Sequence, residues 1–193
     1  QQDVLALLPT GGGKSICFQV PGLAREGITV VISPLIALMQ DQVNNLQAKG
    51  IRANAILSGM TFKQIDIILD NARFGGLDFL YTSPERIKSK LFIERFKLMN
   101  IGLIVVDEAH CISEWGHDFR PEYRRLRTII DAVGSPPVMA LTATATPKVQ
   151  QDIQKNLGMM KANVFKSSFN RENLYYDVRP KLHVNREIIK YVK

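Results

Sequence analysis

Short apolar segments alternate with longer amphipathic segments along most of this chain. The apolar segments have the length of strands, and the β-branched run at residues 29–33 is typical of a strand buried on both faces. We therefore predict strands at residues 4–8, 29–33, 53–57, 78–82, 101–106, 138–141, 162–166 and 174–178. Helices are predicted between and after them, at residues 16–24, 34–48, 62–73, 89–98, 124–132, 147–157 and 186–192.

Several of the predicted helices carry signals for their first residue. Ser33 and Thr146 each offer a hydroxyl N-cap followed by a proline, which suits the first helical position. Thr61 precedes Gln64 by three residues, the spacing of a capping box. A regular alternation of strands and helices indicates an α/β fold, with a mainly parallel β-sheet and helices on both of its faces.

A glycine-rich loop follows the first predicted strand. Residues 8–15 match the phosphate-binding pattern G-x-x-x-x-G-K-[ST] except that Leu8 replaces the first glycine. Three consecutive glycines let the backbone turn tightly and aim its N–H groups at phosphate oxygens. A glycine turn that merely caps a helix is the alternative, and the strand–loop–helix context favours phosphate binding. The predicted nucleotide-binding residues are Pro9, Thr10, Gly11, Gly12, Gly13, Lys14 and Ser15.

An acidic pair follows the most apolar predicted strand. Asp107 stands where a Mg2+-binding Walker B aspartate is expected, and Ser15 would supply a hydroxyl to the same ion. Glu108 is placed to orient or deprotonate a water that attacks the γ-phosphate. Two neighbouring carboxylates in a solvated loop are the commoner arrangement in proteins, but the preceding strand and the glycine loop favour an ATP and Mg2+ site.

Composition narrows the class of protein only slightly. The chain has 193 residues, 46% hydrophobic and 22% charged, which is typical of one globular domain. No apolar run approaches the roughly 20 residues of a membrane-spanning helix, so no membrane partner is expected. Cys17 and Cys111 lack metal-ligand spacing, and we place Cys17 in a buried helix and Cys111 in a loop. A net charge of +7 fits a polyanionic partner or simply a basic domain.

These motifs together resemble a known family. Asp-Glu-Ala-His at residues 107–110, combined with the glycine loop, resembles superfamily 2 helicases. Residues 111–123 resemble the aromatic-rich loop of RecQ-family DNA helicases, with Glu114 where that family more often has glutamine. Further segments that resemble RecQ motifs, namely motifs Ia, Ib and III and the link between the two motor lobes, are residues 33–42, 81–86, 141–146 and 168–174.

The resemblance implies a RecA-like P-loop NTPase lobe and assigns roles to its residues. Lys14 and Ser15 would bind phosphate and Mg2+, Asp107 would hold the metal, and Glu108 would be the catalytic base. His110 would couple the nucleotide site to contacts between lobes. The residues implied to contact or sense single-stranded DNA are Ser33, Trp115, His117, Phe119 and Arg120. The pattern leaves open whether Thr142 or Thr144 is the coupling hydroxyl.

We expect residues 1–178 to form this first lobe and residues 179–193 to connect to a second lobe. The implied activity is that of an ATP-dependent helicase moving 3′ to 5′ on DNA, in the cytoplasm with the nucleoid of a bacterium or in a nucleus. A second lobe would supply a transition-state arginine, so the fragment alone is expected to be inactive. Alternatives are an RNA helicase lobe of the Asp-Glu-Ala-His type, a catalytically silent nucleotide-binding module and, with least support, a small-molecule kinase.

Overall fold

The structure, a computed structural model, describes residues 2–9, 11–87, 89–116, 118–168, 174–175, 177–178 and 180–192. Seven strands form one sheet in the order β3-β4-β2-β5-β6-β1-β7, and every adjacent pair is parallel. The strands are β1 (Val4–Leu7), β2 (Ile28–Ile32), β3 (Ala53–Ile56), β4 (Phe79–Thr82), β5 (Ile101–Val106), β6 (Val138–Thr142) and β7 (Asn163–Lys166). The prediction of a parallel α/β fold is confirmed.

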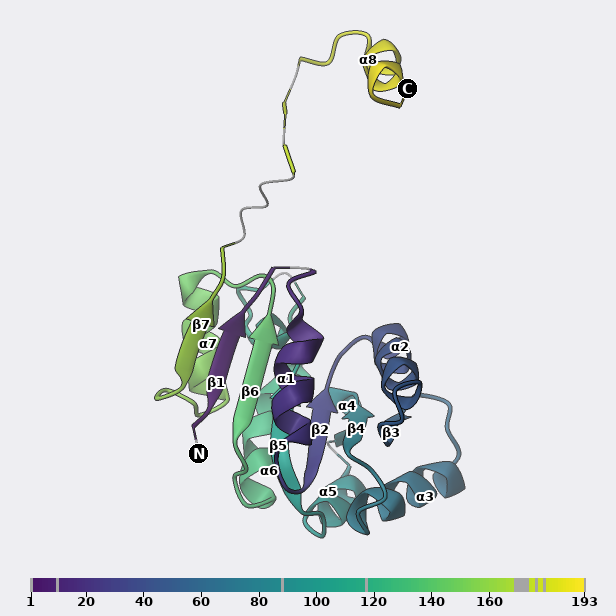
Figure 1. Ribbon diagram of the computed structural model, residues 1–193. Helices are drawn as coiled ribbons and strands as arrows, with labels where there is room; N and C mark the ends of the chain where they lie inside the picture. The colour runs from purple at the N-terminus through teal and green to yellow at the C-terminus, as the bar shows by residue number, and fades with distance from the viewer. Residues whose placement is uncertain are drawn as a thin grey trace.

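Helices connect successive strands, and one further helix follows the last strand. They are α1 (Lys14–Leu23), α2 (Ile36–Gln47), α3 (Phe62–Arg73), α4 (Pro84–Ile87), α5 (Lys90–Phe96), α6 (Leu126–Ala132), α7 (Pro147–Asn156) and α8 (Val184–Val192), with 3-10 turns η1 (Ala109–Ile112) and η2 (Pro121–Arg125). Figure 1 shows α1 and α2 in front of the sheet and α5, α6 and α7 behind it. Thr61 forms the predicted capping box with Gln64, and Thr146 caps α7 by accepting a bond from the Val149 N–H.

Two apolar layers bury the sheet, because successive side chains of a strand point to opposite faces. Val30 and Ile32 of β2 belong to one core cluster with α3, α5, α6 and α7, whereas Val31 belongs to the other with α1 and α2. Residues 103–106 of β5 alternate between the same two clusters. Burial on both faces explains why the central strands are continuous apolar runs.

The carboxyl ends of the strands meet at one edge of the sheet, the upper edge in Figure 1. The glycine loop follows β1, Ser33 follows β2, Asp107 follows β5, and Thr142 ends β6. Parallel topology therefore gathers these four stretches at the edge where α/β sheets bind ligands.

Three local predictions are wrong. Ser33 does not cap a helix, because its backbone N–H continues the sheet by donating to Thr82 O and α2 begins only after Leu35. Cys17 is exposed, since the residues that α1 buries are Phe18, Gln19 and Gly22.

The third wrong prediction concerns the last expected strand. The described residues of 174–178 lie outside any strand, although the predicted terminal helix is present as α8. The predicted interlobe link falls partly on residues 169–173, which lie outside the described residues, as do Thr10 and His117. Among the helices that are described, none combines the length and the apolar character needed to cross a lipid bilayer.

Candidate nucleotide site

The loop between β1 and α1 depends on its glycines. Gly11 and Gly13 have φ angles of 79° and 75°, in the left-handed region where glycine avoids steric cost. At Gly12 an added Cβ would lie 2.9 Å from the Pro9 carbonyl oxygen, which accepts the Gly12 N–H. The tight turn delivers Lys14 and Ser15 to the first turn of α1, where unpaired backbone N–H groups favour an anion.

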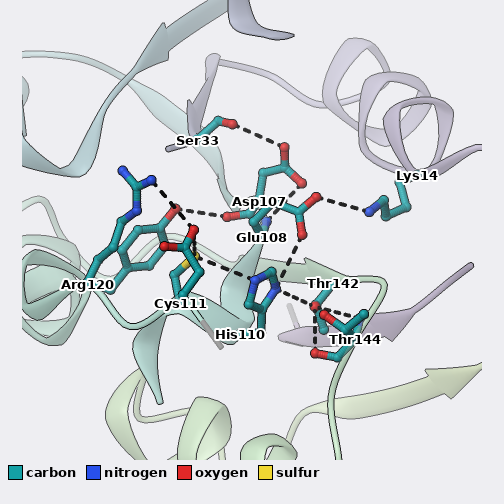
Figure 2. Close-up of polar contacts among 11 residues, drawn as sticks. Lys14, Ser33, Asp107, Glu108, His110, Cys111, Arg120, Thr142 and Thr144 are labelled. Carbon is teal, nitrogen blue, oxygen red and sulfur yellow. Dashed lines mark hydrogen bonds and ion pairs between the residues drawn. The ribbon is translucent and has the colours of Figure 1, made fainter. Parts of the chain in front are cut away.

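Lys14 faces the acidic pair across the edge of the sheet. Its Nζ lies 3.2 Å from Glu108 Oε1, although the two residues are 94 positions apart in the sequence. The glycine loop, Lys14, Ser15, Asp107 and Glu108 line a single pocket of about 440 Å³. The two strand tips therefore form one site, as the sequence predicted, and Figure 2 shows the contact between them.

Asp107 is held in place from several sides. Ser33 Oγ donates to Asp107 Oδ2 at 3.2 Å, the Glu108 N–H donates to Oδ1 at 3.0 Å, and the Tyr123 hydroxyl donates to the Asp107 carbonyl at 3.1 Å. Burial, reinforced by the neighbouring Glu108 charge, raises the pKa of Asp107. A buried carboxylate of this kind is stabilised by a cation, which suits a metal-binding role.

Glu108 has the opposite electrostatic setting. The hydrogen bond from His110 lowers the pKa of Glu108 more than burial raises it, and Lys14 lowers it further. Its two carboxylate oxygens lie 3.2 Å from Lys14 Nζ and 3.3 Å from His110 Nδ1. Glu108 is thus kept ionised, the state in which a carboxylate accepts a proton.

His110 connects the acidic pair to the end of β6. Its Nδ1 lies 3.0 Å from the Thr142 hydroxyl, which also contacts the backbone of Thr144. Of the two threonines that the sequence left open, Thr142 is the one whose side chain contacts His110, and it is fully buried. Figure 2 shows the resulting series of contacts from Lys14 through Glu108 and His110 to Thr142.

Cys111 is buried beside this series and acts as a hydrogen-bond donor. Its thiol donates to Asp118 Oδ2 at 3.7 Å, and its sulfur lies 3.8 Å from His110 Nε2. Burial raises the pKa of the Cys111 thiol to about 12, so the group is protonated at neutral pH. A protonated thiol is a poor metal ligand and a weak nucleophile, which leaves Cys111 a structural role.

The donor set at the pocket fits Mg2+. Asp107 offers a carboxylate and Ser15 a hydroxyl, and hard oxygen ligands of this type are the ones that Mg2+ prefers. Lys14 in the same pocket can contact phosphate oxygens of a nucleotide.

The aromatic-rich segment lies partly open to solvent. Trp115 is 66% exposed, so it does not belong to the core, and the Arg124 guanidinium stacks over the Phe119 ring at 5.1 Å. Arg120 is bound to protein groups: it lies 3.7 Å from Glu85 and 3.6 Å from Asp118.

Sequence reasoning missed several partners of the predicted residues. Tyr123, Glu85, Lys148 and Asp152 all contact the site or the aromatic-rich segment, through bonds that no motif spacing indicated. Ser33 was expected on DNA, yet it is buried against Asp107 in the nucleotide site. Its contact with DNA stays a prediction, as do those of Trp115, Phe119 and Arg120.

Comparison with known proteins identifies the group to which these features belong. Residues 1–153 match the DEAD/DEAH box helicase family. The chain is 45% identical over 194 residues to the ATP-dependent DNA helicase RecQ of Bacillus subtilis, covering 100% of this chain and 33% of that protein. It is 46% identical over 189 residues to the ATP-dependent helicase SGS1 of Saccharomyces cerevisiae, covering 93% of this chain and 13% of that protein.

Solved structures agree on the fold. The helicase domain of Pyrococcus furiosus Hef matches with a TM-score of 0.65 at 21% identity, over 89% of this chain and 36% of that one. The yeast splicing factor Prp28 matches with a TM-score of 0.64 at 20% identity, over 86% of this chain and 41% of that one. The chain spans about a third of the length of the RecQ proteins that it matches. The resemblance to RecQ helicases is confirmed, and the chain belongs to the DEAD/DEAH box helicase family.

Proposed function

We propose that this chain is the first motor lobe of an ATP-dependent DNA helicase that moves 3′ to 5′ along single-stranded DNA. The observation that carries the proposal is the placement of Glu108 between Lys14 and His110, in one pocket with the glycine loop. The curated relatives that cover the whole chain are named DNA helicases, which favours DNA over RNA as the partner.

Each residue of the pocket has its own role in the hydrolysis of ATP. The glycine loop and Lys14 would hold the nucleotide phosphates in the pocket that Asp107 and Glu108 also line. Ionised Glu108 accepts a proton from the attacking water, and Lys14 and His110 hold its carboxylate in position. Asp107 and Ser15 would hold Mg2+, which neutralises charge on the phosphates when bound.

His110 and Thr142 transmit the state of this pocket to the rest of the lobe. Because His110 contacts Glu108 on one side and Thr142 on the other, a shift of β6 or of the residues after it alters the position of the base. A second lobe supplying an arginine to the transition state would complete the site, so we expect residues 1–193 alone to bind nucleotide weakly and to lack turnover. The protein would act wherever the cell keeps its DNA, in the nucleoid or a nucleus.

The test is ATPase activity of the full-length protein with single-stranded DNA, with RNA of the same sequence and without nucleic acid. We expect stimulation by DNA and little by RNA. Glu108→Gln should reduce turnover by about 10²–10⁴-fold while ATP still binds, since a general base contributes a factor of this size. Stimulation by RNA instead would favour an RNA helicase, and unchanged turnover in Glu108→Gln would favour a silent nucleotide-binding module.

A further inference from the structure

Helix α7 contacts the aromatic-rich segment through two residues one turn apart. Lys148 and Asp152 are four positions apart, so their side chains lie on the same face of the helix. Lys148 Nζ lies 3.1 Å from the centroid of the Trp115 ring, and Asp152 accepts a 2.6 Å hydrogen bond from Ser113. We call this arrangement, Lys148 and Asp152 on α7 with Ser113 and Trp115, the α7 clamp.

The Ser113 hydroxyl fixes the backbone of the segment. It donates to Asp152 Oδ2 and accepts the Trp115 N–H at 3.2 Å, and the Ser113 side chain is fully buried. The Ser113 hydroxyl therefore links the backbone of Trp115 to Asp152 on α7. A charge-assisted bond to a carboxylate is among the stronger hydrogen bonds in proteins, which makes Ser113 a firm point of attachment.

Lys148 covers a face of the Trp115 ring on which a nucleic-acid base could stack. A cation over an indole is attracted by the negative face of the ring, and a base stacks on that same face. Trp115 is 66% exposed and Lys148 is also exposed, so a base can reach the ring, and on the face that Lys148 covers it competes with the ammonium group.

We propose that the α7 clamp is an autoinhibitory contact, in which single-stranded DNA replaces Lys148 on the face of Trp115. This inference rests on the proposed function, because it takes single-stranded DNA as the ligand.

The same helix provides a route from Trp115 to the nucleotide pocket. α7 begins at Pro147, a few residues after Thr142, whose hydroxyl contacts His110. Exchange of Lys148 for a base removes one of the two side-chain contacts that make up the α7 clamp. Lys148 is in this account a positioning residue, which acts on Glu108 only through α7, Thr142 and His110.

The experiment uses the fluorescence of Trp115 in the 193-residue chain, which contains one tryptophan. Lys148→Gln removes the ammonium from the ring, and Lys155→Gln is the matched control, since Lys155 is an exposed lysine on the same helix. Without DNA, we expect Lys148→Gln to change the emission of Trp115 and Lys155→Gln to leave it as in the wild type. The two variants lose the same charge, so general attraction to DNA falls equally in both.

Titration with an oligothymidylate at low salt then measures the competition. We expect Lys148→Gln to reach half of its fluorescence change at about two- to five-fold lower DNA concentration than Lys155→Gln, the range implied by an exposed cation–π contact. Coincident titrations of the two variants would overturn the proposal, and so would a Trp115 signal that DNA does not change in the wild type.

ATPase assays of the full-length protein separate this result from the proposed function. If DNA stimulates turnover while the two titrations coincide, the autoinhibitory role of the α7 clamp is wrong and the proposed helicase function stands. If DNA stimulates no turnover in the full-length protein, the proposed function is wrong, and the inference that rests on it is wrong as well. In an intact motor, Lys148→Gln should also raise turnover at subsaturating DNA relative to Lys155→Gln, an effect that a purely structural role would not produce.

Discussion

Glu108 adopts a backbone conformation that glutamate rarely accepts. Its φ and ψ are 47° and 46°, in the left-handed region, which costs a residue other than glycine of order 1–3 kcal/mol. Two backbone hydrogen bonds hold this conformation, because the Glu108 N–H donates to Asp107 and the Glu108 carbonyl accepts from Cys111. The sharp bend after β5 turns the carboxylate toward Lys14 and His110 together.

Gly116 permits the aromatic-rich segment to lie against His110. A Cβ at this position would stand 2.6 Å from the His110 carbonyl oxygen and 3.1 Å from the Ser113 carbonyl oxygen. Gly116→Ala should therefore push the segment away from His110 and reduce stimulation of ATPase activity by DNA in the full-length protein. Nucleotide binding should change little, because the glycine loop and Lys14 are not displaced.

Gly50→Ala is a suitable control for Gly116→Ala. Gly50 has a left-handed φ of 75° with nothing within 4 Å of an added methyl group, so its substitution reports the cost of backbone conformation alone. The measurement is the ratio of turnover with and without DNA, alongside thermal melting of each variant. A Gly116→Ala protein that retains full stimulation would show that close packing on His110 is unnecessary.

At the scale of elements, strand positions could be predicted because burial on both faces imposes a simple apolar pattern. The strand at residues 101–106 was predicted with its observed bounds, and the helix after Thr61 with its capping box. Ser33 misled the prediction, since a serine before a proline has the same local pattern at a strand end as at a helix N-cap. Its hydroxyl bonds to Asp107, a partner 74 residues away that local sequence cannot indicate.

The same limit applies to the candidate site. The glycine loop and acidic pair were predicted as one pocket because parallel strands must bring their carboxyl ends together. The α7 clamp could not be predicted, because Lys148 and Trp115 lie 33 positions apart and neither belongs to a motif that specifies the other. Pairings between side chains of different elements depend on the packed fold.

An ion pair ties the starts of β3 and β4 together at the opposite edge of the sheet. Asp78 accepts bonds from the Arg52 N–H at 3.0 Å and from Arg52 Nε at 3.2 Å, and Arg52 Nη1 donates to the Gly75 carbonyl. Hydrogen bonding by Arg52 lowers the pKa of Asp78. A lowered folded-state pKa means that the folded chain favours the ionised carboxylate, so the pair stabilises the fold above the unfolded pKa of about 3.9.

Asp78→Asn should therefore lower the melting temperature at pH 7, and the difference from the wild type should shrink as the pH falls through the folded-state pKa of Asp78. Added salt should also reduce the difference, since the pair is largely exposed. Thermal melts followed by circular dichroism from pH 7 to about pH 3 measure both effects. Asp41→Asn, an exposed carboxylate on α2, is the control, and an equal pH dependence in the two variants would contradict the role of Arg52.

At the scale of the whole molecule, the sheet and its covering helices form one body, and α8 lies apart from it (Figure 1). Leu182, Val184, Ile188, Ile189 and Tyr191 are exposed on or near α8. An amphipathic helix with an exposed apolar face usually packs against another element or another molecule. We propose that the lobe ends by residue 178, and we expect residues 179–193 to contribute little to its stability.

Removal of residues 179–193 tests this boundary. The shortened chain should melt within about 2 °C of the full 193-residue chain, because a shift of that size corresponds to no more than about 1 kcal/mol in a domain of this length. It should also self-associate less at high concentration, since the exposed apolar residues of α8 are gone. Circular dichroism measures the first effect and sedimentation velocity the second.

A substituted chain with Ile188→Lys and Ile189→Lys retains the helix and should reproduce the reduced association without altering the melting temperature. A large fall in melting temperature on truncation would instead mean that residues 179–193 belong to the core of the lobe, and the boundary would have to move to the end of the chain.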